Sequence, residues 1–310
     1  MEICIALTSH RVEFIPLLRD EALASDIIIL EEPPNESLFR LLRGEITLES
    51  YVRSLDTSFP LYTYFLADLL KNLHSMGKRI LQVEPYLEVV QKIQQSIESG
   101  SFDELIRDER IEKIRQTEKK AFGAFIDYQE AFMSGDFERL IEATINFSRA
   151  DAERFVVRDS MRLDAIADTL RDAGNEPDVR ILIEAGSIHT QIPESLDRML
   201  DMDYVRKINL KKKAAEMLGV EAIKNPGTLL TEIFIRNENI SGEELRTLAA
   251  RSLLYISKVT PEEMMPDSNN RFPHFLEEVR VSEEVYSMDY EQCREEFERI
   301  WKRRNMWKSS

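Results

Sequence analysis

Residues 179–189 have the sequence VRILIEAGSIH, an apolar run that contains one glutamate, reaches a glycine and ends at a histidine. A short apolar run bounded by polar residues is typical of a parallel strand that is covered on both faces. Three further segments share this character: ICIALTSH (3–10), DIIILEEP (26–33) and RILQVEP (79–85). The sequence therefore predicts a set of buried parallel strands, each of which ends in polar side chains.

Helical patterns separate the first three of these strands, at about residues 13–24 and between residues 36 and 76. Strands that alternate with helices are typical of α/β proteins with a parallel sheet. After His189, residues 193–200 suit a short helix, and residues 204–210, YVRKINL, suit a fifth strand. We therefore predict the α/β class, with a mostly parallel central sheet and flanking helices.

A long helical insertion is expected between the third and fourth strands. Apolar residues recur at helical spacing over residues 86–98, about 101–133 and 136–172, and Gly135 and Asp136 suit the end of one helix and the cap of the next. The last two of these helices would form an antiparallel pair.

These patterns also predict how the chain divides into domains. An α/β core is expected over residues 1–210, with the helical insertion at about 86–174. Residues 211–310 carry further helical patterns and are predicted to form a helical extension that packs on the core.

The composition limits the class of protein. A hydrophobic fraction of 43% and a charged fraction of 32% are typical of a globular chain. The formal net charge of −16 argues against binding to nucleic acid or to an anionic membrane, because both need concentrated Lys and Arg. The sequence has no apolar stretch long enough to span a membrane and no secretory signal pattern. Cys4 and Cys293 lack metal or disulfide spacing. We expect a cytoplasmic protein.

The predicted strand ends carry the residues of a candidate site. In open parallel sheets the ligand lies beyond the carboxyl ends of the strands. The polar residues at these ends are Thr8, Ser9 and His10, then Glu31 and Glu32, then Glu84, and finally Glu184, Gly186 and His189. A single histidine at a strand end is more often structural. Two at equivalent places, with carboxylates on the strands between them, favour a shared site, and Gly186 is expected to let the chain turn into it.

Glu31 and Glu184 follow apolar residues, so both carboxylates are expected to be buried. A buried carboxylate needs a cation, a cluster of donors or a metal nearby. Arg158 and Arg162 lie four residues apart on one flank of a predicted helix and could supply the cation. An ordinary ion pair on the helix surface is the alternative. For Glu32, which precedes two prolines, a solvated turn is favoured.

The order of these motifs resembles the superfamily that contains TraB, Tiki and erythromycin-esterase-like proteins and also ChaN. Over about residues 1–210 the resemblance rests on a histidine motif, a glutamate step, a helix arginine motif and a second histidine motif: Leu7-Thr8-Ser9-His10, Ile29-Leu30-Glu31, Arg158-Asp159-Ser160-Met161 and Gly186-Ser187-Ile188-His189. The step Gln82-Val83-Glu84 is similar to a motif of the TraB branch. Leu7 stands where the group usually has glycine, and Val157 where it often has glutamate.

The resemblance implies a hydrolase that activates water in one pocket, as in the metal-dependent Tiki proteases and in esterases that have no serine nucleophile. His10 would be the general base or a metal ligand, and Glu31 would orient it or share the metal. His189 would be a second base or ligand, and Arg158 would stabilise the oxyanion. The residues expected to bind substrate are Ser9, Glu84, Arg162 and Glu184.

A divalent metal held by His10, Glu31 and His189 is a further expectation, with manganese, cobalt, zinc and iron all compatible with imidazole and carboxylate ligands. The substrate would be a small molecule or a peptide.

Two other readings stay open. The same pocket could sequester a small ligand without catalysis, which the departures at Leu7 and Val157 favour. Alternatively, the helical hairpin over residues 101–172 could be an interaction surface, and a homodimer through the helical regions is compatible with every reading.

Overall fold

The computed structural model describes residues 1–55, 57–100, 108–173, 178–200 and 205–306. Its sheet contains five strands in the order β3-β2-β4-β1-β5, and every neighbouring pair is parallel. The strands are β1 (Glu2–Thr8), β2 (Ile27–Leu30), β3 (Arg79–Gln82), β4 (Arg180–Gly186) and β5 (Val205–Asn209). The α/β class and the parallel sheet are therefore confirmed, and Tyr204 lies outside the described residues.

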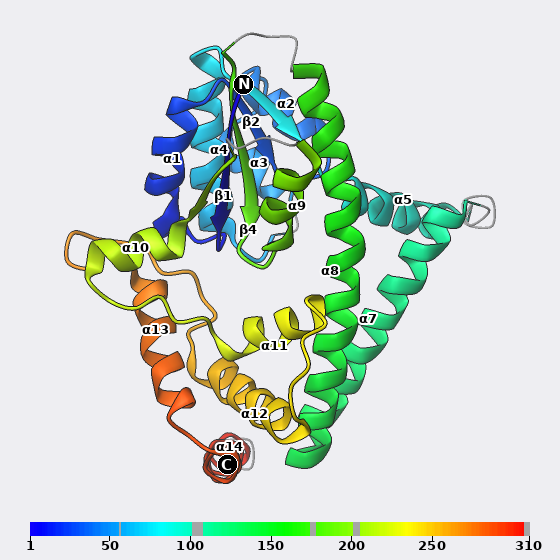
Figure 1. Ribbon diagram of the computed structural model, residues 1–310, viewed down its shortest axis with the longest axis vertical. Coiled ribbons are helices and arrows are strands. Elements are labelled where there is room, and N and C mark those ends of the chain that lie inside the picture. The colour runs from blue at the N-terminus through cyan, green and yellow to red at the C-terminus, as the bar shows by residue number, and fades with distance from the viewer. Residues whose placement is uncertain (56, 101–107, 174–177, 201–204, 307–310) are drawn as a thin grey trace. The chain divides into compact units, whose positions relative to one another are not determined.

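The position of β4 decides where the polar strand ends meet. β4 pairs with β1 on one side and with β2 on the other, and its register places Gly186 beside Thr8. A strand that follows the long helical insertion thus lies between two strands from the start of the chain (Figure 1). Because the strands are parallel, the carboxyl ends of β1, β2, β3 and β4 share one edge of the sheet.

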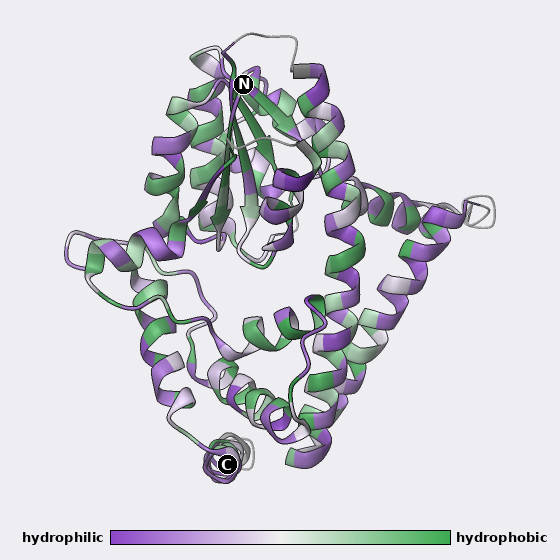
Figure 2. Ribbon diagram, viewed as in Figure 1, coloured by the Kyte–Doolittle hydropathy of each residue, from purple (hydrophilic) through white to green (hydrophobic). Residues whose placement is uncertain are grey.

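Helices cover both faces of this sheet. On one face, apolar side chains of β1, β2 and β4 form a core cluster with α8 (Phe137–Ala173) and α9 (Gln191–Leu200), to which Leu163, Ile166 and Leu196 contribute. On the other side lie α1 (Ile15–Ala24) and α4 (Pro60–Ser75) (Figure 1). The central strands are among the most hydrophobic segments of the chain (Figure 2), as burial on both faces requires.

The predicted helical insertion is confirmed in the described residues. It consists of α5 (Pro85–Ser99), α7 (Glu109–Ser134) and α8, while residues 101–107 of the predicted second helix lie outside the described residues. Gly135 ends α7 with a φ of 71°, and the side chain of Asp136 accepts a hydrogen bond from the Arg139 amide. The predicted helix break and cap are therefore confirmed, because glycine adopts this left-handed conformation without a Cβ penalty.

The remaining helical elements complete the chain. They are η1 (Val12–Phe14), α2 (Glu36–Leu42), α3 (Leu48–Arg53), α10 (Leu210–Leu218), α11 (Pro226–Ile235), α12 (Gly242–Lys258), α13 (Pro273–Tyr286) and α14 (Tyr290–Met306). In the described part of the chain, no helix has the combination of length and apolar character that crossing a membrane requires.

The chain forms two compact units, each assembled from separate segments. Unit 1 contains residues 1–92, 158–221 and 261–275 and holds the sheet. Unit 2 contains residues 93–157, 222–260 and 276–310 and has its own core of α7, α8, α11, α12, α13 and α14 side chains. These units differ from the expected division at residue 210, because residues 93–157 group with unit 2 and residues 211–221 and 261–275 group with the sheet.

Candidate active site

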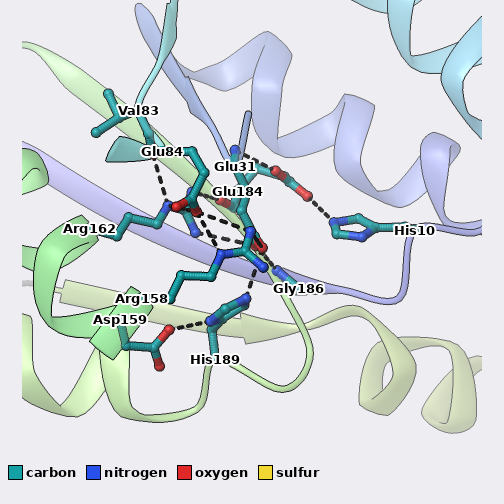
Figure 3. A network of polar contacts seen from close by, with 10 residues as sticks. All are labelled: His10, Glu31, Val83, Glu84, Arg158, Asp159, Arg162, Glu184, Gly186 and His189. Carbon is teal, nitrogen blue, oxygen red and sulfur yellow. Dashed lines mark hydrogen bonds and ion pairs between the residues drawn. The ribbon is translucent and has the colours of Figure 1, made fainter. Parts of the chain in front are cut away.

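A network of charged side chains occupies the carboxyl edge of the sheet (Figure 3). His10 follows β1, Glu31 follows β2, Glu84 follows β3, and β4 supplies Glu184 and leads to His189. Helix α8 adds Arg158, Asp159 and Arg162. All of these residues belong to unit 1. The structure thus brings together the residues that the sequence predicted for one site.

Glu31 is the centre of the network. Its Oε1 accepts a hydrogen bond from Arg158 Nη2 at 2.6 Å and lies 2.8 Å from His189 Nε2. Its Oε2 accepts bonds from the Gly186 amide at 2.5 Å and from Arg162 Nη1 at 3.3 Å. Burial raises the pKa of Glu31, but the charges of His189 and Arg162 outweigh it and hold this pKa well below its ordinary value. Glu31 is therefore a buried carboxylate that keeps its charge.

His189 is enclosed between two carboxylates. Only 1% of its side chain is exposed, its Nδ1 contacts Asp159 Oδ1, and its Nε2 contacts Glu31. Burial lowers the pKa of His189, but the charge of Glu31 and the hydrogen bond to Asp159 raise it to about 9. At neutral pH the ring is thus an imidazolium that donates from both nitrogens. This geometry suits a fixed cation and does not suit the second base that we expected.

Arg162 joins the ends of three strands. Its side chain is 0% exposed, its Nε donates to the Val83 carbonyl at 3.1 Å, and its Nη2 donates to the Glu184 carbonyl at 2.6 Å. Its third contact is the carboxylate of Glu31. We expected Arg162 to bind substrate, but these contacts are those of a group that holds the edge of the sheet together.

Arg158 and Glu84 lie beside this centre. Arg158 donates to Glu84 Oε2 at 3.0 Å as well as to Glu31, and 16% of its side chain is exposed. Burial raises the pKa of the Glu84 carboxyl group more than Arg158 lowers it. The other oxygen of this group, Oε1, is buried and has no hydrogen-bond partner among the described residues.

His10 is the accessible imidazole of the site. Its side chain is 35% exposed, and its Nε2 lies 2.9 Å from Glu184 Oε1. Burial lowers the pKa of His10, but the hydrogen bond and the charge of Glu184 raise it above the ordinary value. Glu184 Oε2 in turn accepts the Glu31 amide at 3.1 Å. We expected Glu31 to orient His10; the structure gives this contact to Glu184, which therefore faces the site.

Gly186 lies beside both histidines of the site. A Cβ at this position would lie 3.4 Å from each of His10 Cε1, His189 Cδ2 and Glu31 Oε2, so the two ring carbons are within twice that distance of each other. The backbone of Gly186 is not among those with positive φ. The turn that we expected at Gly186 therefore does not need the conformational freedom of glycine, and a Cβ at this position would make ordinary van der Waals contacts.

Further residues at this edge differ from expectation. Ser9, expected to bind substrate, has a buried hydroxyl with no hydrogen-bond partner among the described residues. Glu32 is half-buried and accepts from Gln82 Nε2 at 3.0 Å, so the solvated turn was wrong. Tyr62 of α4 was missed, although its ring centroid lies 5.3 Å from that of His10. Asp159 was part of a quoted motif, but its contact with His189 was not predicted.

The three residues expected to bind a metal are engaged with protein groups. Both ring nitrogens of His189 contact carboxylates, and His10 contacts Glu184. No group of three or more His, Cys, Asp or Glu side chains in the described ranges is arranged to hold a metal ion. As placed, these side chains do not fit a divalent metal. Metal binding by His10, Glu31 and His189 stays a prediction that metal analysis tests.

Comparison with known proteins gives one clear relationship. No family model matches the chain, and no solved structure matches it significantly. The resemblance to the TraB, Tiki and erythromycin-esterase-like group therefore stays a prediction. A protein of Archaeoglobus fulgidus, described as uncharacterized, is 37% identical over 297 residues, which cover 96% of this chain and 98% of the relative. The chain therefore belongs to the same family as this archaeal protein.

Proposed function

We propose that this protein is a hydrolase that cleaves an ester or amide bond with water activated by His10. One observation carries the proposal. An imidazole with 35% of its side chain exposed is held by the buried carboxylate of Glu184, next to a rigid network of buried charges. The resemblance to the TraB, Tiki and erythromycin-esterase-like group supports the same reaction class.

The reaction uses His10 as a general base and then as a general acid. Because Glu184 accepts from Nε2, the proton sits on that nitrogen, and Nδ1 takes a proton from water. The water oxygen then bonds to the carbonyl carbon, and the carbonyl electron pair moves to oxygen. When the intermediate collapses, the bond to the leaving group breaks and the leaving oxygen or nitrogen takes the proton from Nδ1. Proton transfer of this kind contributes about 10²–10⁴-fold in rate.

The other charged residues hold His10 and the carboxyl edge of the sheet in position. Arg162 and His189 fix the carboxylate of Glu31, and the Glu31 amide fixes Glu184. A site built this way has its dipoles in place before the reaction, so little energy is spent on reorganisation. Arg158 is the partly exposed cation of the network and adds positive charge near the reacting carbonyl.

We propose that the enzyme acts on a small molecule or a peptide. We also propose that it works in the cytoplasm, because its two cysteines are buried and form no disulfide. The acidic net charge of −16 supports a protein that does not bind nucleic acid.

A second candidate is a protein that sequesters a small ligand at the same edge. Arg158 favours this candidate, because its charge is already balanced by Glu31 at 2.6 Å and Glu84 at 3.0 Å. A cation that is paired twice gives less help to a developing oxyanion than a free one.

Replacement of His10 by asparagine tests the hydrolase. His10 has a φ of 50°, and asparagine tolerates this conformation better than most residues, so His10→Asn should fold. His74→Asn, which changes an exposed histidine of α4, is the control. The purified proteins are assayed against ester, amide and phosphoester panels, with and without a chelator, after metal analysis.

We expect ester or amide turnover by the wild type and by His74→Asn, and a loss of about 10²–10⁴-fold in His10→Asn. Turnover by His10→Asn at the wild-type rate would refute the role of His10. A wild type that carries a bound organic compound and hydrolyses nothing would instead establish the second candidate.

A further inference from the structure

Some buried polar atoms without hydrogen-bond partners among the described residues belong to residues close to His10 in the sequence. Among the described residues, eight residues each have one such atom; Ser9 and Arg11 are the sequence neighbours of His10, and Thr8 lies two positions before it. The hydroxyl of Tyr62, on α4, belongs to the same set. A buried polar group without a hydrogen bond costs about 1–3 kcal/mol, so groups of this kind bond to water or to a bound molecule.

Tyr62 is the best placed of these donors. Its ring centroid lies 5.3 Å from that of His10, and only 7% of the residue is exposed. The backbone of Tyr62 is held in position, because Glu263 accepts hydrogen bonds from the amides of Leu61 at 2.7 Å and Tyr62 at 2.9 Å. The first turn of α4 is thus held in place, while the Tyr62 hydroxyl has no hydrogen-bond partner in the part of the chain that the structure describes.

We propose that Tyr62 is a catalytic residue whose hydroxyl donates to the carbonyl oxygen of an ester or amide substrate. This inference rests on the proposed function and names the donor that it lacked. Arg158 is paired with two carboxylates, whereas the Tyr62 hydroxyl is a neutral donor that has no partner among the described residues. Neutral donors aimed at a developing oxyanion stabilise it without first breaking an ion pair.

The chemistry of the phenol suits this role. Burial raises the pKa of Tyr62 well above its ordinary value, and the nearby carboxylates of Glu184 and Glu32 raise it further. The hydroxyl therefore keeps its proton at every pH at which the enzyme would work. As water adds to the carbonyl carbon, the charge that forms on oxygen is met by the Tyr62 O–H, and the proton taken by His10 returns to the leaving group.

Tyr62→Phe tests this inference, because it removes the hydroxyl and keeps the ring against His10. Tyr64→Phe, two residues along the same helix, is the matched control. One measurement is turnover of the substrate identified with the ester and amide panel. The other is calorimetric binding of phenylboronate, whose tetrahedral hydroxide adduct mimics the oxyanion and which needs no known substrate.

Removal of one oxyanion donor costs on the order of 10²–10³-fold in kcat. We expect that loss in Tyr62→Phe, with KM little changed, and phenylboronate binding at least tenfold weaker than in Tyr64→Phe. If His10→Asn is inactive while Tyr62→Phe equals Tyr64→Phe in both measurements, this inference fails and the proposed function stands. If the wild type neither hydrolyses the panel nor binds phenylboronate, both fail.

Discussion

His10 and His189 show how two similar residues can differ in role. Both follow strands of the same sheet, and the sequence predicted both for the site. The structure leaves 35% of the His10 side chain exposed and 1% of the His189 side chain. The sequence could not separate them, because the second carboxylate on His189 is Asp159, which comes from α8. Two carboxylates raise the pKa of His189 to about 9, so this histidine is charged at neutral pH, whereas His10 has one carboxylate partner and a partly exposed ring that water can reach.

The charge of His189 predicts how stability depends on pH. The pKa of His189 is raised to about 9 in the folded state from an ordinary value of 6.5. Its contribution is therefore fully present below pH 6.5 and is lost as the pH rises through about 9. A shift of this size corresponds to about 3 kcal/mol in the free energy of unfolding.

Urea unfolding at pH 6.5, 8 and 9.5 measures this effect in the wild type and in His189→Gln, which cannot be protonated. We expect the wild type to lose more stability than the variant across this range. Equal losses in the two proteins would show that His189 is not held as a cation in the folded state.

At the scale of elements, α8 places two arginines one turn apart in different surroundings. Arg162 is fully buried and bonds to two backbone carbonyls and to Glu31. Arg158 is partly exposed and bonds to the carboxylates of Glu31 and Glu84. The helical spacing predicted that both would face one flank, but periodicity does not measure depth. The difference depends on how closely α8 packs on the sheet.

Replacement of each arginine by methionine tests this difference. Arg162→Met removes one cation from the buried carboxylate of Glu31 and removes the hydrogen-bond donor of two backbone carbonyls. Breaking such a buried ion pair lowers the free energy of unfolding by about 3–5 kcal/mol. Arg158→Met should cost less, because Arg162 and His189 still neutralise Glu31. Denaturant unfolding of the two variants gives the comparison. A larger loss in Arg158→Met would contradict the assignment of Arg162 as the residue that joins the strands.

Two glycines show what element-level patterns can predict. Gly135 follows a helical pattern and precedes an aspartate, and its role as a helix end follows from local sequence. Gly186 was expected to let the chain turn, but its backbone has no positive φ, and a Cβ built there would make ordinary contacts with three side chains at 3.4 Å. A glycine in the sequence therefore predicts a special conformation only where the local pattern also ends a helix.

At the scale of the whole molecule, the topology is what creates the site. The apolar runs were sufficient to predict the strands and the edge where their polar ends meet. They did not predict that β4 lies between β1 and β2, because all of these strands are apolar on both faces and no local signal chooses neighbours. This order brings Glu184 to His10, a pair separated by 174 positions in the sequence.

The sequence patterns also did not predict the division into these two compact units. The boundary between units falls inside α8, between residues 157 and 158, where the helix continues without interruption. A domain boundary inside a helix has no loop, glycine or change in composition to mark it. The helical patterns after residue 211 predicted helices that pack on the α/β core, whereas side chains of α11 and α12 form a core cluster with α7 and α8.

The pairing of His10 with Glu184 is the central claim, and nitrogen NMR of the imidazole rings tests it without a substrate. The chain has four histidines, so single replacements assign each signal. In the wild type we expect the pKa of His10 to lie above 6.5, because Glu184 raises it more than burial lowers it, and we expect it to fall in Glu184→Gln. A His10 that titrates at or below pH 6.5 in the wild type, or that Glu184→Gln leaves unchanged, would contradict this account.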